Sequence, residues 1–207
     1  MALWNAPLIT EYHALYACEA ALSCQRKLRE KNEVWNRLGL PEFRARIGIN
    51  TGEVLIGNVG SFQRFNYTAI GDNVNISARL EGLGKRYGVD IILGEGSYRK
   101  VCHKFLCRLL DKVAVKGKLV PLSIYELVVE IDTATQEQKD FCQSYTDAFN
   151  LLLQNDIGSS YRAFEILSAK YPEDKATRML FLRLEKLFRN QGNEQVKWPG
   201  FQTYYEK

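Results

Sequence analysis

The segment FNYTAIGDNVNISAR, which spans Phe65–Arg79, predicts a turn that leads into a helix. Asp72 or Asn73 is a suitable N-cap residue, because its side-chain oxygen can accept hydrogen bonds from the first free backbone N–H groups of a helix. We expect the helix to run to about Tyr87. The residues that it would turn toward a sheet are Val74, Ala78 and Leu83.

Two polar side chains share one face of this predicted helix. Asn75 and Arg79 are four residues apart, which is about one helical turn. A carboxamide beside a planar guanidinium, both near the start of a helix, suits an anionic, oxygen-rich ligand such as a phosphorylated sugar. A plainer interpretation is that Asn75 supports the helix cap and that Arg79 pairs with Glu81 or Glu95 on the surface.

Four motifs resemble those of class III nucleotidyl cyclases, in the same order and at similar spacing. They are NYTAIGDNVNISARLE at Asn66–Glu81, RIGINTGEVLIGNVG at Arg46–Gly60, KRYGVDIIL at Lys85–Leu93 and LDKVAVKGK at Leu110–Lys118. The resemblance covers roughly residues 1–128. Four linked motifs are far more specific than a single glycine-rich loop.

This resemblance implies an α+β, ferredoxin-like catalytic domain over residues 1–130, of the bacterial adenylyl type. Such domains pair head to tail, and two composite sites lie between the copies. One copy supplies two aspartates that hold Mg²⁺ or Mn²⁺, and the other supplies an Asn and an Arg. The ribose 3′-hydroxyl of ATP attacks the α-phosphorus, which forms 3′,5′-cyclic AMP for signal transduction and releases pyrophosphate.

The resemblance also implies roles for individual residues. Asn75 matches the Asn that orients the ribose, and Arg79 matches the Arg that stabilises charge on the α-phosphoryl group. Thr68 matches the base-selecting position, where its hydroxyl can accept a hydrogen bond from the adenine amino group but can also donate one. Lys116 matches the basic residue that reaches the terminal phosphates, with Lys118 as second candidate. A basic hairpin tip without a ligand is an equally good interpretation of these lysines.

The chain departs from the family pattern at its start. The family domain opens with a strand that carries one metal-binding Asp, and a hairpin carries the second, whereas Met1–Pro7 resembles only the end of that hairpin. Asp72, Asp90 and Asp111 are single carboxylates on separate predicted elements, and Mg²⁺ needs carboxylates that converge with substrate phosphates. We therefore expect an N-terminally truncated domain that holds no metal and is inactive alone. It would act in a homodimer or with an intact cyclase.

The composition excludes several other classes of protein. The 207 residues are 46% hydrophobic and 25% charged, which is typical of a globular chain with a packed core. The net charge of +4 is unclustered, and the short run Arg26–Lys31 is expected on a solvated helix face rather than on a nucleic-acid surface. No apolar run is long enough to predict a membrane segment, although full-length relatives often carry membrane-anchored sensors.

The cysteines indicate a reducing, cytoplasmic setting. They form no C-x-x-C pair, and their odd number favours free thiols over a disulfide framework. The five positions are Cys18, Cys24, Cys102, Cys107 and Cys142.

Before the central motif, the hydrophobic pattern predicts a helix and two strands. Residues 11–33 form an amphipathic helix that packs on a sheet, and the segment 39–41 ends it. Residues 43–50 and 53–58 form two strands, with Thr51-Gly52 as a tight hairpin turn. A short loop at residues 61–65 then leads to the motif.

After the motif, the pattern returns to strands of one sheet. Residues 89–93 predict a short buried strand and residues 95–101 a short helix. Residues 105–115 and 122–129 predict two further strands, and Lys116-Gly117-Lys118 lies in the turn between them.

The C-terminal part, residues 131–207, predicts a small helical domain. Its helices are expected at Gln136–Leu153, Gly158–Lys170 and Asp174–Arg189, in a pattern similar to a tetratricopeptide-like helical hairpin. One such repeat cannot bury much apolar surface alone, so we expect it to pack on the cyclase domain or on a partner.

Three functions stay open from the sequence. The first is an adenylyl-type cyclase that supplies only the Asn and Arg half of a shared site. The second is a catalytically inactive regulatory or dimerisation module that binds an intact cyclase. The third is a partner-capturing helical tail, with the remainder as a remnant.

Overall fold

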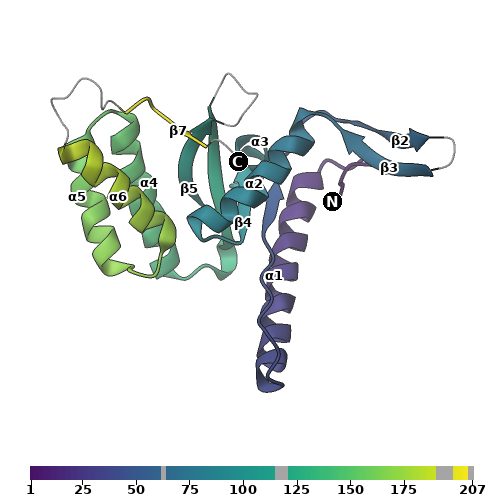
Figure 1. Cartoon of the computed structure of the whole chain (residues 1–207), viewed down its shortest axis with the longest axis horizontal. Coiled ribbons are helices and arrows are strands. Elements are labelled where there is room, and N and C mark those ends of the chain that lie inside the picture. The colour runs from purple at the N-terminus through teal and green to yellow at the C-terminus, as the bar shows by residue number, and fades with distance from the viewer. Residues whose placement is uncertain (62–63, 115–120, 190–197, 205–207) are drawn as a thin grey trace.

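A mixed β-sheet forms the centre of the computed structural model, which describes residues 1–61, 64–114, 121–189 and 198–204. The sheet has five strands in the order β1-β4-β6-β5-β7. The strands are β1 Ile47–Ile49, β4 Ile91–Gly94, β6 Leu122–Glu130, β5 Phe105–Ala114 and β7 Gln202–Thr203. β1 runs parallel to β4 and β7 parallel to β5, whereas β6 is antiparallel to both of its neighbours. With its helices, the sheet gives the α+β architecture predicted from the sequence (Figure 1).

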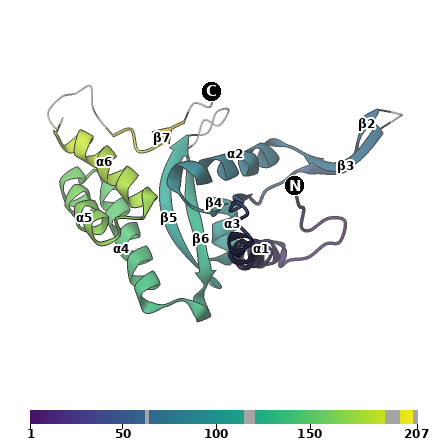
Figure 2. The ribbon, with the colours of Figure 1, turned by 60° about the horizontal axis from the view of Figure 1, so that its bottom comes forward.

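Helices cover the sheet on both faces. α1 (His13–Arg37) and α3 (Glu95–Val101) share one apolar cluster with the sheet, whereas α2 (Asp72–Tyr87) belongs to a second. Ile91 and Leu93 of β4 lie in the first cluster and Ile92 in the second. Successive strand residues point to opposite faces, so this short run of buried aliphatic residues is a strand covered on both sides. Figure 2 shows β4 between α2 and α1.

The first predicted helix is present as α1, and its far end projects from the body in Figure 1. The chain then returns alongside it. The Asn32 amide donates to the carbonyl of Phe43 at 2.7 Å, and Gln25 donates to the carbonyl of Ala45 at 2.7 Å. Because helix side chains satisfy these backbone groups, residues 43–46 form no strand, and the predicted strand 43–50 shortens to β1.

The predicted hairpin between residues 43–50 and 53–58 is wrong. β1 pairs with β4, and β2 (Leu55–Ser61) pairs instead with β3 (Arg64–Ile70), so the predicted loop at residues 61–65 overlaps the ends of both strands. Thr51 lies between β1 and β2, which do not pair with each other, and its hydroxyl is 2.9 Å from that of Ser97 on α3. β2 and β3 form an arm that extends away from the sheet (Figure 1).

The remaining predicted elements are confirmed. β4, α3, β5 and β6 follow the predicted order, and the tail forms α4 (Gln136–Leu153), α5 (Ile157–Lys170) and α6 (Lys175–Arg189). Side chains fix the helix starts: Thr135 and Gln138 form a capping box on α4, and Asp156 accepts from the Ser159 N–H at 3.0 Å on α5. The turn Ile131–Thr133 separates β6 from α4.

The tail packs on the domain that precedes it, which is one of the two arrangements expected from the sequence. Leu180, Leu184 and Leu187 of α6 belong to the same buried cluster as Leu80 and Leu83 of α2. After α6 the chain returns to the sheet as β7, beside β5 (Figure 2). The division of the chain at residues 130 and 131 falls at the end of β6 and stays a prediction.

A buried arginine also joins the sheet to the tail. The Arg108 side chain on β5 is 1% exposed; its Nε donates to Glu126 on β6, and its two Nη atoms donate to the two carboxylate oxygens of Asp174, each at 2.9 Å. The guanidinium also lies 4.7 Å from the ring centroids of both Phe141 and Tyr145. Burial opposes ionisation of Asp174, but the Arg108 hydrogen bonds and charge outweigh it and lower the pKa of that carboxyl.

All five cysteines have free thiols, as predicted. Burial raises the pKa of Cys18 to about 12 and that of Cys142 to about 11, so both are inert at neutral pH. Within the described segments, none of the helices combines the length and apolarity that crossing a membrane requires.

Candidate functional site

The turn between β3 and α2 orients the candidate residues. Gly71 is the N-cap of α2, with φ at +152°, a backbone conformation that favours glycine. The helix begins at Asp72, so the prediction of Asp72 or Asn73 as N-cap is wrong. The Asn73 carboxamide has other partners, because it donates to the Glu53 carbonyl at 2.9 Å and accepts from Asn50 at 3.0 Å. The start of α2 is thereby tied to the segment between β1 and β2.

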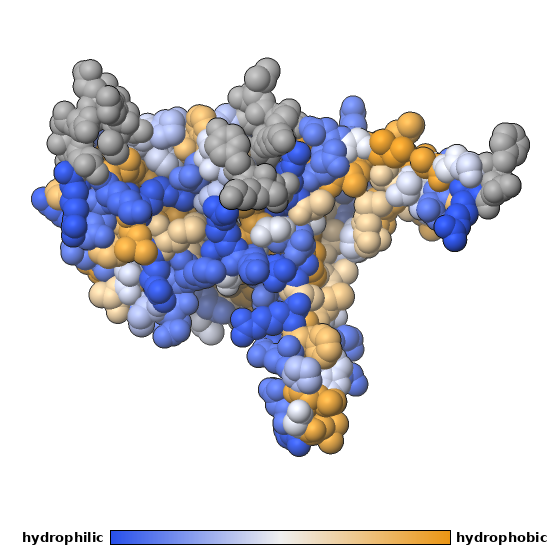
Figure 3. Space-filling view, in the orientation of Figure 1, coloured by the Kyte–Doolittle hydropathy of each residue, from blue (hydrophilic) through white to orange (hydrophobic). Residues whose placement is uncertain are grey.

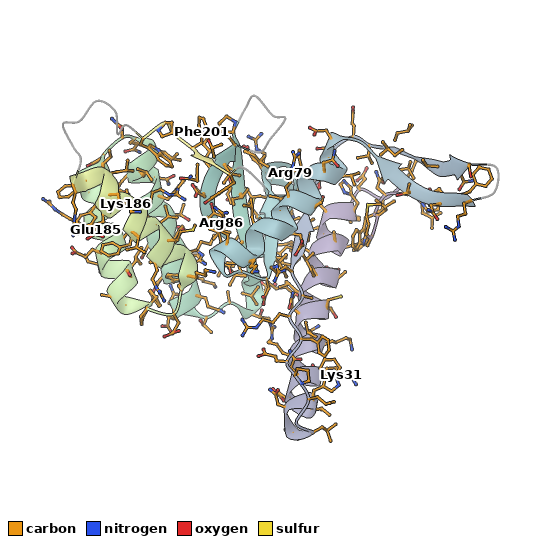
Figure 4. The ribbon with its side chains drawn as sticks, viewed as in Figure 1. Lys31, Arg79, Arg86, Glu185, Lys186 and Phe201 are labelled. Carbon is orange, nitrogen blue, oxygen red and sulfur yellow. The ribbon has the colours of Figure 1, made fainter. Side chains whose placement is uncertain are left out.

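The buried face of α2 differs from the predicted one. Leu83 is buried as expected, but Val74 is half-buried and Ala78 is exposed. The residues that face the core instead are Ile76, Leu80, Leu83, Gly84 and Tyr87, which follow a helical i, i+4, i+7, i+8, i+11 stripe. Asn75 is consequently exposed and Arg79 half-buried, beside that stripe on the outer side of the helix. Figure 4 labels Arg79 on α2, toward the β2–β3 arm.

A glycine in β1 sets how closely α2 approaches the sheet. A Cβ atom at Gly48 would lie 2.2 Å from the carbonyl oxygen of Ser77 and 2.5 Å from the backbone nitrogen of Glu81. Both atoms belong to the backbone of α2, on either side of Arg79, and cannot move independently of the helix. Glycine at residue 48 therefore holds the helix that carries Asn75 and Arg79 at its observed distance.

We expect Gly48→Ala to destabilise the protein by about 1–3 kcal/mol, because the added methyl must push α2 away from β1. Urea unfolding followed by circular dichroism measures this free energy. Gly57→Ala is the matched control, since a Cβ at Gly57 would meet no atom within 4 Å. Equal unfolding midpoints for the two variants would contradict the close contact.

The other two candidate binding residues lie outside α2. Thr68 is half-buried on β3, opposite Gly57 on β2, and precedes α2 in the same β3–α2 unit as Asn75 and Arg79. Lys116 and Lys118 fall outside the described residues. The structure therefore groups Asn75 with Arg79 on one helix face, and places Thr68 at the base of the arm that leads into it.

The two carboxylates that the plainer interpretation assigns to Arg79 have other arginine partners. Glu81 accepts from Arg46 at 3.1 Å, which joins α2 to the residue before β1. Glu95 pairs with Arg99 one turn along α3.

The described residues do not fit a divalent-cation site. Among them, no group of three or more His, Cys, Asp or Glu side chains comes together in a way that could hold a metal. Asp111 is fully buried and already accepts from Tyr87 and pairs with Arg183. Asp72 and Asp90 are exposed, one on the first turn of α2 and the other before β4. A carboxylate set of the kind that Mg²⁺ requires is therefore not assembled from these three residues.

The sequence interpretation missed the buried polar residues beside α2. Asp111 was considered only as an isolated carboxylate, and Tyr87 only as the end of a helix. A signal was present, because the charged residues Arg108, Asp111 and Lys112 interrupt an otherwise apolar strand at Phe105–Val113, and the first two are buried. Buried charges need partners, and here the tail provides them.

Comparison with known proteins covers strands β1–β6 and the first three helices. A family model described as "Adenylate and Guanylate cyclase catalytic domain" matches residues 1–129, which leaves α4–α6 and β7 outside the match. The chain is 42% identical over 128 residues to adenylate cyclase 1 of Rhizobium meliloti, covering 61% of this chain and 19% of that protein. It is 41% identical over 118 residues to the adenylate cyclase of Anabaena cylindrica, covering 54% and 24%. The chain thus spans a quarter or less of the length of these relatives.

Two solved structures share the fold. The adenylyl cyclase CyaB from P. aeruginosa is 28% identical, with a TM-score of 0.55, over 60% of this chain and 64% of that one. The guanylyl cyclase Cya2 is 29% identical, with a TM-score of 0.54, over 64% and 66%. These similarities confirm the predicted ferredoxin-like α+β domain, and α4–α6 follow it as the predicted helical tail.

Proposed function

We propose that this chain, which belongs to the adenylate and guanylate cyclase catalytic domain family, supplies the Asn75 and Arg79 half of a composite adenylate cyclase site. The site would form at a dimer interface and convert ATP into 3′,5′-cyclic AMP and pyrophosphate. The observation that carries this proposal is the placement of Asn75 and Arg79 on the outer side of α2, while the apolar stripe of the helix faces the core.

The two side chains fit different parts of the reaction. The ribose 3′-oxygen gives up its proton and bonds to the α-phosphorus, while the bond from that phosphorus to the leaving pyrophosphate breaks. Negative charge grows on the α-phosphoryl oxygens and on the leaving group, where the planar guanidinium of Arg79 can donate two hydrogen bonds. The Asn75 carboxamide both donates and accepts, which suits a sugar hydroxyl and ring oxygen.

The nucleotide base would be read by residues outside α2. Thr68 lies on β3, where its hydroxyl can accept a hydrogen bond from the adenine amino group. Gly57 opposite adds no side chain that would cover it. Lys116 retains its proposed role at the terminal phosphates on the strength of the motif alone.

We assign the cations of the composite site to a partner. Class III cyclases generally use divalent metal ions, and bound metals would neutralise the triphosphate. Since the described residues do not fit such a site, we propose an intact cyclase as the partner that holds them. The β2–β3 arm offers apolar surface for pairing, seen as orange in Figure 3. Its exposed apolar side chains are Leu55, Val59, Phe65, Tyr67 and Ile70.

A rescue assay tests this function. The chain is mixed in equal amounts with the cyclase region of the Rhizobium relative, in which the positions aligned with Asn75 and Arg79 are changed to Ala. With ATP and Mn²⁺, we expect cyclic AMP from the mixture and none from either protein alone. If the mixture makes no cyclic AMP but native mass spectrometry detects a complex, the result would favour the regulatory module.

A further inference from the structure

The C-terminal end of α2 is anchored by a buried hydroxyl. Tyr87, the last residue of the helix, is completely buried, and its hydroxyl donates to Oδ2 of Asp111 at 2.6 Å. The same hydroxyl lies 2.8 Å from that of Tyr204, which follows β7, and the two rings meet edge to face. A single side chain of α2 therefore contacts both β5 and the residue that follows β7.

Asp111 connects this hydroxyl to the tail. It is completely buried on β5, and its Oδ2 also lies 2.8 Å from Nη2 of Arg183 on α6. Its Oδ1 accepts from the backbone N–H of Lys112 at 2.8 Å. Burial and the neighbouring Asp111 charge raise the pKa of Tyr87 well above its usual value, so the phenol stays a hydrogen-bond donor.

Two further contacts hold the same end of the helix. Lys175 Nζ, at the start of α6, donates to the carbonyl of Lys85 in the last turn of α2 at 2.9 Å. The guanidinium carbon of Arg86 lies 4.2 Å from the centroid of the Tyr204 ring. Figure 4 shows Arg86 at the end of α2 that faces α6, with Arg79 nearer the other end. These polar contacts between the tail and α2 lie at the C-terminal end of the helix, away from Asn75 and Arg79.

We propose that Tyr87 is a positioning residue through which the tail sets the orientation of Asn75 and Arg79. The inference rests on the proposed function of those two residues. An α-helix rises about 1.5 Å per residue, so Tyr87 stands ~12 Å from Arg79 along the axis. If the Tyr87 end of α2 is loosened, the helix can rotate and displace the guanidinium of Arg79. A displacement of ~1 Å can remove much of the rate enhancement that a catalytic group provides. The tail, which lies outside the family match, would then help to position the site residues that lie within the match.

Tyr87→Phe isolates this contact, because it removes the hydroxyl and keeps the ring in the core. Tyr145→Phe is a matched control. Tyr145 is also completely buried between tail and sheet, and its hydroxyl donates to the Leu110 carbonyl at 3.0 Å, but it lies on α4 and not on α2. Both full-length variants are compared with the unmodified chain in the rescue mixture. Hydrogen exchange over residues 72–82 is measured on each chain alone.

In the mixture, we expect Tyr87→Phe to lower kcat by ~10-fold with KM for ATP within about 2-fold, and Tyr145→Phe to leave both within about 2-fold. Without a partner, Tyr87→Phe should speed exchange in the first turns of α2, and Tyr145→Phe should not. If the unmodified mixture makes no cyclic AMP but the two variants still differ in exchange, then Tyr87 does hold the end of α2 and the proposed function fails. Equal behaviour of the two variants in exchange overturns the anchor, whatever the activity.

Discussion

Arg79→Ala in this chain is expected to lower the turnover of the rescue mixture by ~10²–10³-fold, while the dissociation constant for ATP changes by less than about 5-fold. The guanidinium would contact the phosphoryl oxygens on which negative charge develops as the bonds form and break. Most of the stabilisation that it provides therefore appears only in the transition state. Steady-state cyclic AMP production gives kcat, and binding of a non-hydrolysable ATP analogue gives the affinity.

Two variants sharpen this result. Arg99→Ala removes an exposed arginine of α3 that pairs with Glu95, and it should leave turnover unchanged. Arg79→Lys keeps the charge but loses the planar pair of donors, so we expect it to recover only part of the lost rate. A loss of ATP binding as large as the loss of rate would mean that Arg79 holds the substrate rather than the transition state.

Arg108→Ala is expected to produce the largest loss of stability, about 3–5 kcal/mol in the free energy of unfolding. The substitution leaves the carboxylates of Glu126 and Asp174 close together with no cation between them. Both side chains are 21% exposed and therefore only partly hydrated. It also removes the cation stacked against Phe141 and Tyr145, so the sheet and the tail lose contacts at once.

Chemical denaturation of the Arg108 variant, monitored by circular dichroism, provides the measurement. Arg189→Ala is the control, because Arg189 pairs with Glu185 on α6 at 2.6 Å while its own side chain is 75% exposed. Exposed pairs of this kind contribute about 0–1 kcal/mol. Indistinguishable midpoints for the two arginine variants would show that the buried cluster does not hold the tail on the sheet.

Much of the fold followed from local sequence signals. The tail helices begin at side chains that cap them, such as Thr135 and Asp156, and these signals act within a few residues. The hairpin at Thr51-Gly52 failed because a local turn signal says nothing about which distant strand completes the pairing. β3 was missed because most of its residues are exposed, so it lacks the alternation of buried and exposed residues that identifies a half-buried strand.

The candidate site was predictable only in part. The motif predicted Asn75 and Arg79 as site residues; both lie on the outer side of α2, and their roles stay a prediction. The error over Val74 and Ala78 came from choosing apolar residues singly, instead of following the stripe from Ile76 to Tyr87. The Tyr87 anchor could not be predicted, because Tyr204 is 117 residues away and no local pattern connects them.

The most direct test of the shared site is a reciprocal pair of mixtures, in which this chain meets two different variants of the Rhizobium relative. One variant lacks the residues aligned with Asn75 and Arg79; the other keeps them but lacks its two metal-binding aspartates. We predict cyclic AMP from the first mixture and none from the second, because this chain can replace only the Asn and Arg half. Cyclic AMP from the second mixture, or from neither while the complex forms, would contradict the account.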